Sequence, residues 1–312
     1  RVLSDLAARV HAFLPPAPGP GAPGDPGLFG PGSAAWAVGR ERALLLAGPA
    51  ALLLQVAHPL VGAGVAAHSD FSADPLRRLR GTLDAVLTVT FGDRRQGLGA
   101  ARRVGARHAP VRGTLAADSR TFPAGSRYTA HDPALAQWVW ATLAWSALRV
   151  TGAVVRPVPA WERDAYVRDM RRFGHLFGVP PDAPDDAVTL EAYVRHQVEE
   201  TLDVGPTARE LADRILRPEP PLLPPPLRPL PALLAAALLP EQVRDAYGLP
   251  WRRRDRLAWA ALRGAVRLTV RVLPRTAREW PHARAARARL GDAPPGGRPF
   301  SASGTTARRT GV

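Results

Sequence analysis

The sequence predicts an all-α protein built around a single multi-helix domain, and three observations support this prediction. The pairs Asp74-Pro75 and Asp132-Pro133 each place an N-cap residue before a proline that suits the first helical position. Thr207 and Glu210 have the spacing of a capping box. Strand signals are confined to residues 114–130, where a Pro-Ala-Gly-Ser turn favours one short hairpin.

Apolar spacing and stop signals then give the elements in order. Residues 1–32 are expected to form a short helix and a Pro/Gly-rich segment, residues 33–290 the helical domain, and residues 291–312 a disordered basic tail. Within the domain, helices are expected at 75–92, 98–109, from 133, at 160–177, from 207, and at 241–247, 251–273 and 275–290.

A long apolar run covers residues 43–67 and has the length of a membrane span. It contains Pro49, Gln55, His58 and Pro59, and prolines and an imidazole in its middle favour a pair of buried core helices instead. Nothing in the first thirty residues resembles a signal peptide. We therefore expect a cytoplasmic protein, soluble or peripheral at a membrane.

Composition excludes several classes of site. The 312 residues are 46% hydrophobic and 22% charged, which is typical of a globular chain. The absence of cysteine excludes disulfides, Cys-ligated metal centres and a Cys nucleophile. All 42 basic residues are arginine, which excludes Schiff-base lysine chemistry and a phosphate-loop lysine.

The net charge of +15 lies mostly at the C-terminal end, where fifteen arginines from residue 251 onward face three acidic residues. Such a basic helix suits peripheral contact with an anionic membrane, and it equally suits a solvated arginine-rich face. No nucleic-acid-binding motif is present, so we expect no nucleic-acid partner.

Two motifs are weak in their context. Gly62, Gly64 and Ala67 match a dinucleotide fingerprint but lack the preceding strand, so we expect small residues that permit close helix packing. His196 and Glu199 are one helical turn apart and are compatible with a shared metal, although a solvated polar face explains them as well.

A stronger candidate is His108, which continues the stripe of Ala101, Val104 and Val111 at helical spacing and is therefore predicted to be buried. A buried histidine is either a hydrogen-bonded core residue or a ligand, for example the proximal ligand of haem iron. Arg78 and Thr82 share a helix face, where the arginine suits a carboxylate such as a haem propionate. His58 lies within the apolar run and His68 lies beside it, and either residue lines a pocket or bonds to backbone.

Together these residues resemble the catalytic domain of the MpaB and rubber-oxygenase family. The resemblance covers roughly residues 36–255 and rests on the series AHPLV, HSDF, DP, R-x-x-x-T, FG and H-x-x-V-R-G, read in this order. It implies an all-α haem b protein with a buried haem pocket and His108 as the proximal iron ligand. The R-x-x-x-T motif falls on Arg78 and Thr82, which become candidate catalytic residues, with Arg78, His58 and His68 as further cofactor-binding candidates.

The resemblance also implies a reaction in which dioxygen cleaves the double bond of an apolar, isoprenoid-like substrate. Rubber oxygenases have a lysine just before the motif threonine, and here Gly81 occupies that position. Their active-site glutamate has no clear counterpart around Gly62. A haem-binding or sensing protein without turnover is therefore the alternative hypothesis, and a helical membrane-surface protein without cofactor is the third.

Overall fold

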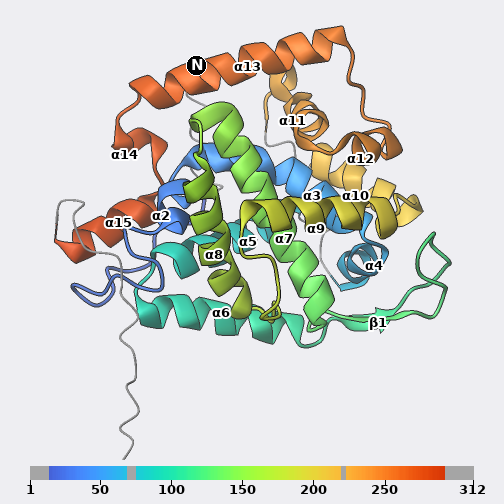
Figure 1. Cartoon of the computed structure of the whole chain (residues 1–312), viewed down its shortest axis with the longest axis horizontal. Coiled ribbons are helices and arrows are strands. Elements are labelled where there is room, and N and C mark those ends of the chain that lie inside the picture. Colours follow the sequence, from blue (N-terminus) through green and yellow to red (C-terminus); the bar gives the residue numbers. More distant parts are fainter. Residues whose placement is uncertain (1–13, 69–74, 219–222, 292–312) are drawn as a thin grey trace, which may run out of the picture.

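The computed structural model describes residues 14–68, 75–218 and 223–291, and only the backbone of residues 75–78. This part of the chain is almost entirely helical, with one two-stranded antiparallel sheet in which Gly113 lies opposite Tyr128 (Figure 1). The predicted all-α class and the predicted hairpin are therefore confirmed. The proposed domain boundaries stay a prediction, and residues 1–13 and 292–312, which include most of the expected basic tail, lie outside the described residues.

In chain order the elements are α2 (Ala34–Gly39), η1 (Arg42–Ala47), α3 (Gly48–Ala57), α4 (Pro59–His68), α5 (Pro75–Phe91), α6 (Arg94–His108), β1 (Arg112–Thr114), β2 (Arg127–Thr129), α7 (Pro133–Val150), η3 (Thr151–Val155), α8 (Ala160–His175), α9 (Ala187–Glu200), α10 (Pro206–Leu216), η4 (Pro225–Leu227), α11 (Leu230–Leu238), α12 (Glu241–Ala246), α13 (Arg253–Val272), α14 (Arg275–Arg278) and α15 (Pro281–Leu290).

Helix α7 runs through the middle of the molecule and packs against α3, α8, α9 and η1 (Figure 1). The Trp138 indole is fully buried and donates a hydrogen bond of 3.2 Å to the carbonyl of Leu54 in α3. With η3, a π-helical turn, α7 is long and apolar enough to cross a membrane, but 61% of its most apolar window is buried within the protein. The core helix of a globular domain has the same properties.

The apolar run forms the expected pair of helices. Helices α3 and α4 meet at His58 with a bend of 103° because Pro59 starts the second helix and removes a backbone donor. Most of α3 lies in the main core, including Leu53 and Leu54, which are fully buried.

The predicted caps have different outcomes, and the one at Asp74 lies outside the described residues. The Asp132 carboxylate accepts a hydrogen bond of 2.8 Å from the backbone N–H of Ala134, as expected for an N-cap. The prediction of a capping box at Thr207 and Glu210 is wrong. Helix α10 begins one residue before Thr207, at a proline whose φ is already helical, so Thr207 lies inside the first turn and Glu210 pairs with Arg214 at 2.8 Å instead.

The C-terminal helices dock onto the N-terminal part of the domain. The helix expected at 275–290 is interrupted where Glu279 forms an isolated β-bridge with Glu41, and the Trp280 N–H donates to the Arg40 carbonyl at 3.0 Å. Pro281 then starts α15, which packs on α5. Trp280 is buried in a satellite core with Trp36 and Phe91.

Candidate functional site

Most of the candidate residues lie where the C-terminal ends of α4 and α6 approach the N-terminal end of α5 and the hairpin. We call this region the α4–α6 corner. Helix α6 packs along α5, and α4 contacts both strands of the hairpin. A Cβ on Gly64 of α4 would lie 3.5 Å from the Tyr128 ring of β2 and 3.8 Å from Val111, which follows α6. These are ordinary van der Waals distances, so α4 lies directly against the hairpin at Gly64.

His108 is the last residue of α6. The helix ends there because Pro110 follows two residues later, and the Ala109 N–H still bonds to the Gly105 carbonyl at 3.0 Å. The imidazole is exposed, so the prediction that it lies on a buried stripe is wrong. The buried residues of α6, namely Gly97, Ala100 and Ala101, all lie in its first half. Other elements cover this apolar face only along the first half of α6, and the last turn of the helix faces solvent.

Arg78 lies at the same level of the helix pair as His108. Helices α5 and α6 are neighbours joined by a tight turn (Figure 1). At 1.5 Å per residue, Arg78 and His108 are each about 20 Å along their helices from that turn. The side chain of Arg78 lies outside the described part. Its backbone position places it beside the end of α6, as a partner of the proposed ligand requires.

Thr82 lies one helical turn further along α5 and is exposed. Between the two motif residues, Gly81 leaves a space that is covered by Arg107, whose Nη1 is 3.5 Å from where a Cβ on Gly81 would lie. A Cβ on Gly105 of α6 would meet nothing within 4 Å. Gly105 thus leaves open space on α6 near His108, whereas Arg107 lies over the backbone of α5 at Gly81.

Arg107 was not among the residues expected from sequence. The sequence signal that could have identified Arg107 is Gly81, because a residue without a side chain leaves room for a long side chain from a neighbouring helix. A guanidinium therefore stands near the place where rubber oxygenases have a lysine.

His68 connects α4 to the hairpin. Its Nε2 donates to the carbonyl oxygen of Arg112 at 2.9 Å, because a carbonyl only accepts, and its ring meets Tyr128 edge to face at a centroid distance of 6.2 Å. The bond to backbone is one of the two roles expected for this residue, and it leaves Nδ1 as the ring acceptor.

The structure does not bring His58 into the α4–α6 corner. It lies at the opposite end of α4 from His68, about 15 Å away along the helix. The imidazole is 5% exposed and packs against the Phe122 ring, with no partner for Nδ1 among the described residues. Burial lowers the pKa of His58 to about 4, so the ring is neutral at neutral pH.

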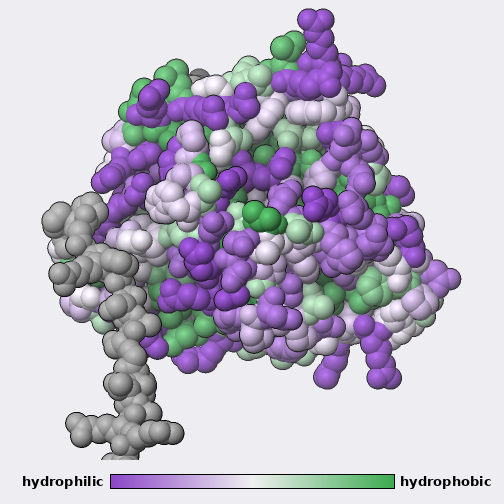
Figure 2. All heavy atoms as spheres, viewed as in Figure 1, coloured by the Kyte–Doolittle hydropathy of each residue, from purple (hydrophilic) through white to green (hydrophobic). Residues whose placement is uncertain are grey.

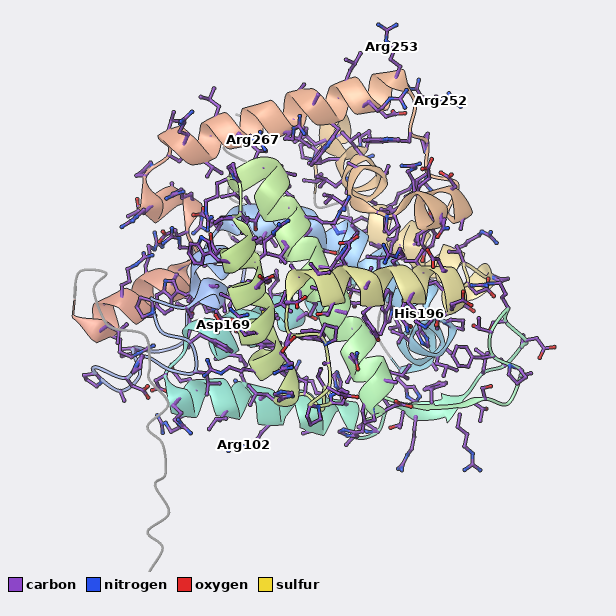
Figure 3. All side chains as sticks on the ribbon, in the orientation of Figure 1. Arg102, Asp169, His196, Arg252, Arg253 and Arg267 are labelled. Carbon is purple, nitrogen blue, oxygen red and sulfur yellow. The ribbon has the colours of Figure 1, made fainter. Side chains whose placement is uncertain are left out.

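The weaker motifs are explained by packing and solvation. A Cβ on Gly62 would lie 2.7 Å from the Val56 carbonyl oxygen, which confirms that small residues allow the α3–α4 bend. His196 and Glu199 are both exposed on α9 (Figure 3). In the described part of the chain, no three His, Asp or Glu side chains gather as ligands for a metal ion.

The α4–α6 corner fits haem in its donor set and its charge. Haem iron needs one protein ligand because the porphyrin supplies four nitrogens, and an accessible imidazole at a helix end provides it. Arg107 and Arg112 are exposed, lie close to His108 along the chain, and match the two carboxylates of haem b in charge. The described side chains leave this imidazole open to solvent, however, and do not enclose it as the expected buried pocket would.

Comparison with known proteins gives one family. The model described as "ER-bound oxygenase mpaB/B'/Rubber oxygenase, catalytic domain" matches residues 35–289, which is most of the chain. No curated protein and no solved structure gives a significant match.

Proposed function

The chain belongs to the MpaB and rubber-oxygenase catalytic-domain family, and from this membership we propose that it is a haem b-dependent oxygenase whose iron is bound by His108. The observation that carries the proposal is the position of His108 at the open end of α6, level with the first turn of α5, where the motif arginine lies. Haem would supply the activation of dioxygen.

His108 would hold the haem iron through the lone pair of one ring nitrogen. Helix α6 holds the backbone of His108 in place because the capping box of Asp93 and Gln96 anchors its start and Pro110 ends it. A ligand on a helix is positioned more precisely than one on a loop.

Arg78 and Thr82 act on the α5 side of the same corner. Arg78 would pair with a propionate of the cofactor, and Thr82 would contribute a hydroxyl that donates or accepts one hydrogen bond. Arg107, whose guanidinium lies over Gly81, would add a second cation for the cofactor carboxylates.

The substrate is proposed to be an apolar alkene of isoprenoid type that reacts with dioxygen. Family membership alone supports this choice. The apolar run at 43–67 does not add to it, because Leu53, Leu54 and their neighbours in α3 are buried in the core and line no open surface.

A haem-binding protein without turnover is the second candidate. The observation in its favour is Gly81, where Arg107 covers the position of the lysine of rubber oxygenases. A guanidinium is always protonated, so it does not exchange a proton as a lysine ammonium does.

The test is purification of the protein with a haem supply, followed by its visible spectrum and its oxygen consumption with a polyprenyl alkene. We expect about one haem per chain and carbonyl products. Bound haem without oxygen uptake would favour the second candidate, and a protein that takes up no haem would refute both.

A further inference from the structure

An arginine-lined cleft of about 690 Å³ lies between the C-terminal half of α13, α14 and the end of η3. One acidic side chain, Glu41, lines it, together with six arginines: Arg40, Arg156, Arg267, Arg271, Arg275 and Arg278. Figure 3 shows Arg267 on α13 at one side of the molecule and Arg102 on α6 at the other. The cleft is therefore separate from the α4–α6 corner.

Three of these arginines are already neutralised by buried carboxylates. Arg156 pairs with Glu162, and Arg278 lies 3.1 Å from Glu41. Arg40 lies between Glu41 at 3.6 Å and the fully buried Glu279 at 3.5 Å. This group forms the inner wall of the cleft and is fixed by its own ion pairs.

The outer three arginines have little or no such compensation. Among the described residues, Arg267 and Arg271 have no carboxylate within 4.0 Å, and Arg275 has one at 3.9 Å. Arg267 donates to the carbonyl of Gly152 at 3.0 Å, which fixes its guanidinium against the first turn of η3. Because the ion pairs of the inner wall largely cancel its charge, these three outer arginines create a positive potential at the opening of the cleft.

This arrangement matches a phosphate group. A guanidinium presents paired N–H donors that fit two phosphate oxygens, and several guanidinia together balance the charge of a phosphate monoester or diphosphate. The cleft also has an apolar side formed by Val155, Val270 and Leu273.

Apolar side chains continue from the cleft onto the outer surface. Leu268 and Val272 are 62% and 69% exposed on the same half of α13, and Figure 2 shows a hydrophobic patch over that end of the helix. The ligand that fits both features is a phosphate that carries an apolar chain.

We propose that this cleft binds the phosphate group of an amphiphilic ligand, supplied either by an anionic phospholipid or by a soluble organic phosphate. Arg267, Arg271 and Arg275 bind the phosphate oxygens, and Leu268 and Val272 contact the apolar chain. A bilayer headgroup would place α13 along the membrane surface, whereas a soluble amphiphilic phosphate would bind with its phosphate in the cleft and its apolar chain on Leu268 and Val272.

The test compares two double variants that remove the same charge from exposed arginines. Arg271→Gln with Arg275→Gln alters the cleft, and Arg256→Gln with Arg263→Gln alters α13 away from it. The probes are inorganic pyrophosphate, measured by calorimetry, and phosphatidylcholine vesicles with and without phosphatidic acid, measured by sedimentation. Circular dichroism checks that both variants fold.

We expect saturable binding of at least one probe, weakened at least about tenfold in the cleft variant, or about 1.4 kcal/mol, and within about twofold of wild type in the control. If pyrophosphate binds and phosphatidic acid vesicles do not, the ligand is a soluble phosphate. If phosphatidic acid vesicles bind, whether or not pyrophosphate competes with them, the ligand is a lipid headgroup. The proposal is overturned if neither probe binds saturably, or if both variants weaken binding equally, because the effect would then be one of overall charge.

Discussion

His282 is a buried histidine without a hydrogen-bond partner. It is 1% exposed, and neither ring nitrogen has a partner among the described residues. Burial lowers its pKa to about 4, as it does for His58. Because an unfolded histidine titrates near pH 6.5, the unfolded chain takes up a proton between pH 6.5 and 4 while the folded chain does not.

The free energy of unfolding should therefore be highest above pH 6.5 and fall as the pH approaches 4, by about 3 kcal/mol for each of these two histidines. His282→Leu has a similar volume and removes both unpaired nitrogens, so we expect a shallower loss and a higher stability at pH 5. Denaturant unfolding across this pH range checks the result. His196→Gln, at an exposed histidine, serves as the control. If the free energy of unfolding of His282→Leu falls with pH as steeply as that of wild type, another group controls this pH dependence.

At the scale of one element, helix ends depend on local chemistry that the sequence reveals only in part. The start of α7 was predictable because Asp132 stands directly before Pro133. The start of α6 was expected near residue 98 but lies at Arg94, because the buried Asp93 accepts from the Gln96 N–H at 2.7 Å and the Gln96 side chain accepts from the Asp93 N–H. A capping box of Asp and Gln gives the same contacts as the Ser/Thr form.

Asp93→Ala should lower the free energy of unfolding by about 1–2 kcal/mol, because the cap of α6 is lost together with the bond from Asp93 Oδ2 to the Ala22 N–H. Thr207→Ala should change it by less than about 0.5 kcal/mol, because Thr207 is exposed inside α10 and caps nothing. Thermal and urea unfolding measure both. An equal loss of stability in the two variants would show that Thr207 does cap α10.

The end of α6 shows what a periodic pattern leaves open. The spacing of Ala101, Val104 and His108 correctly defines one face of the helix, but it does not tell whether another element covers that face. In the structure the cover reaches Ala101 and ends before His108, which is exposed. Burial of a helix end is decided by residues distant in sequence, so the position of His108 was predictable and its exposure was not.

At the scale of the whole molecule, the helical class followed from caps and spacing, whereas the docking of the C-terminal segment did not. The bridge between Glu41 and Glu279 joins residues that are far apart in the chain, and the fully buried Glu279 pairs with Arg40, Arg275 and Arg287. No local pattern contains such a contact. The arginine-rich composition after residue 251 therefore gave the charge of this segment but not its place.

This docking predicts different effects for two truncations. Removal of residues 292–312 should leave the unfolding midpoint and any haem content unchanged. Removal from residue 279 onward deletes Trp280, Ala283 and Ala286, which are buried against Trp36 and Phe91, and should lower stability by several kcal/mol at about 25 cal/mol per Å² of apolar surface. Thermal unfolding of both proteins is the measurement. Equal midpoints would show that α15 adds nothing to the core.

The role of His108 is tested most directly by the haem content and the ferrous visible spectrum of His108→Ala, compared with the exposed control His196→Ala. Because His108 is exposed at the end of α6, its removal should leave the circular dichroism spectrum and the fold intact, so loss of haem is not a packing effect. We expect His108→Ala to lose most of its haem, His108→Gln to fold without the normal ferrous spectrum, and His58→Ala and His68→Ala to retain more haem than His108→Ala. Full haem with an unchanged spectrum in His108→Ala, together with loss in a variant at His58 or His68, would contradict the assignment and move the iron ligand.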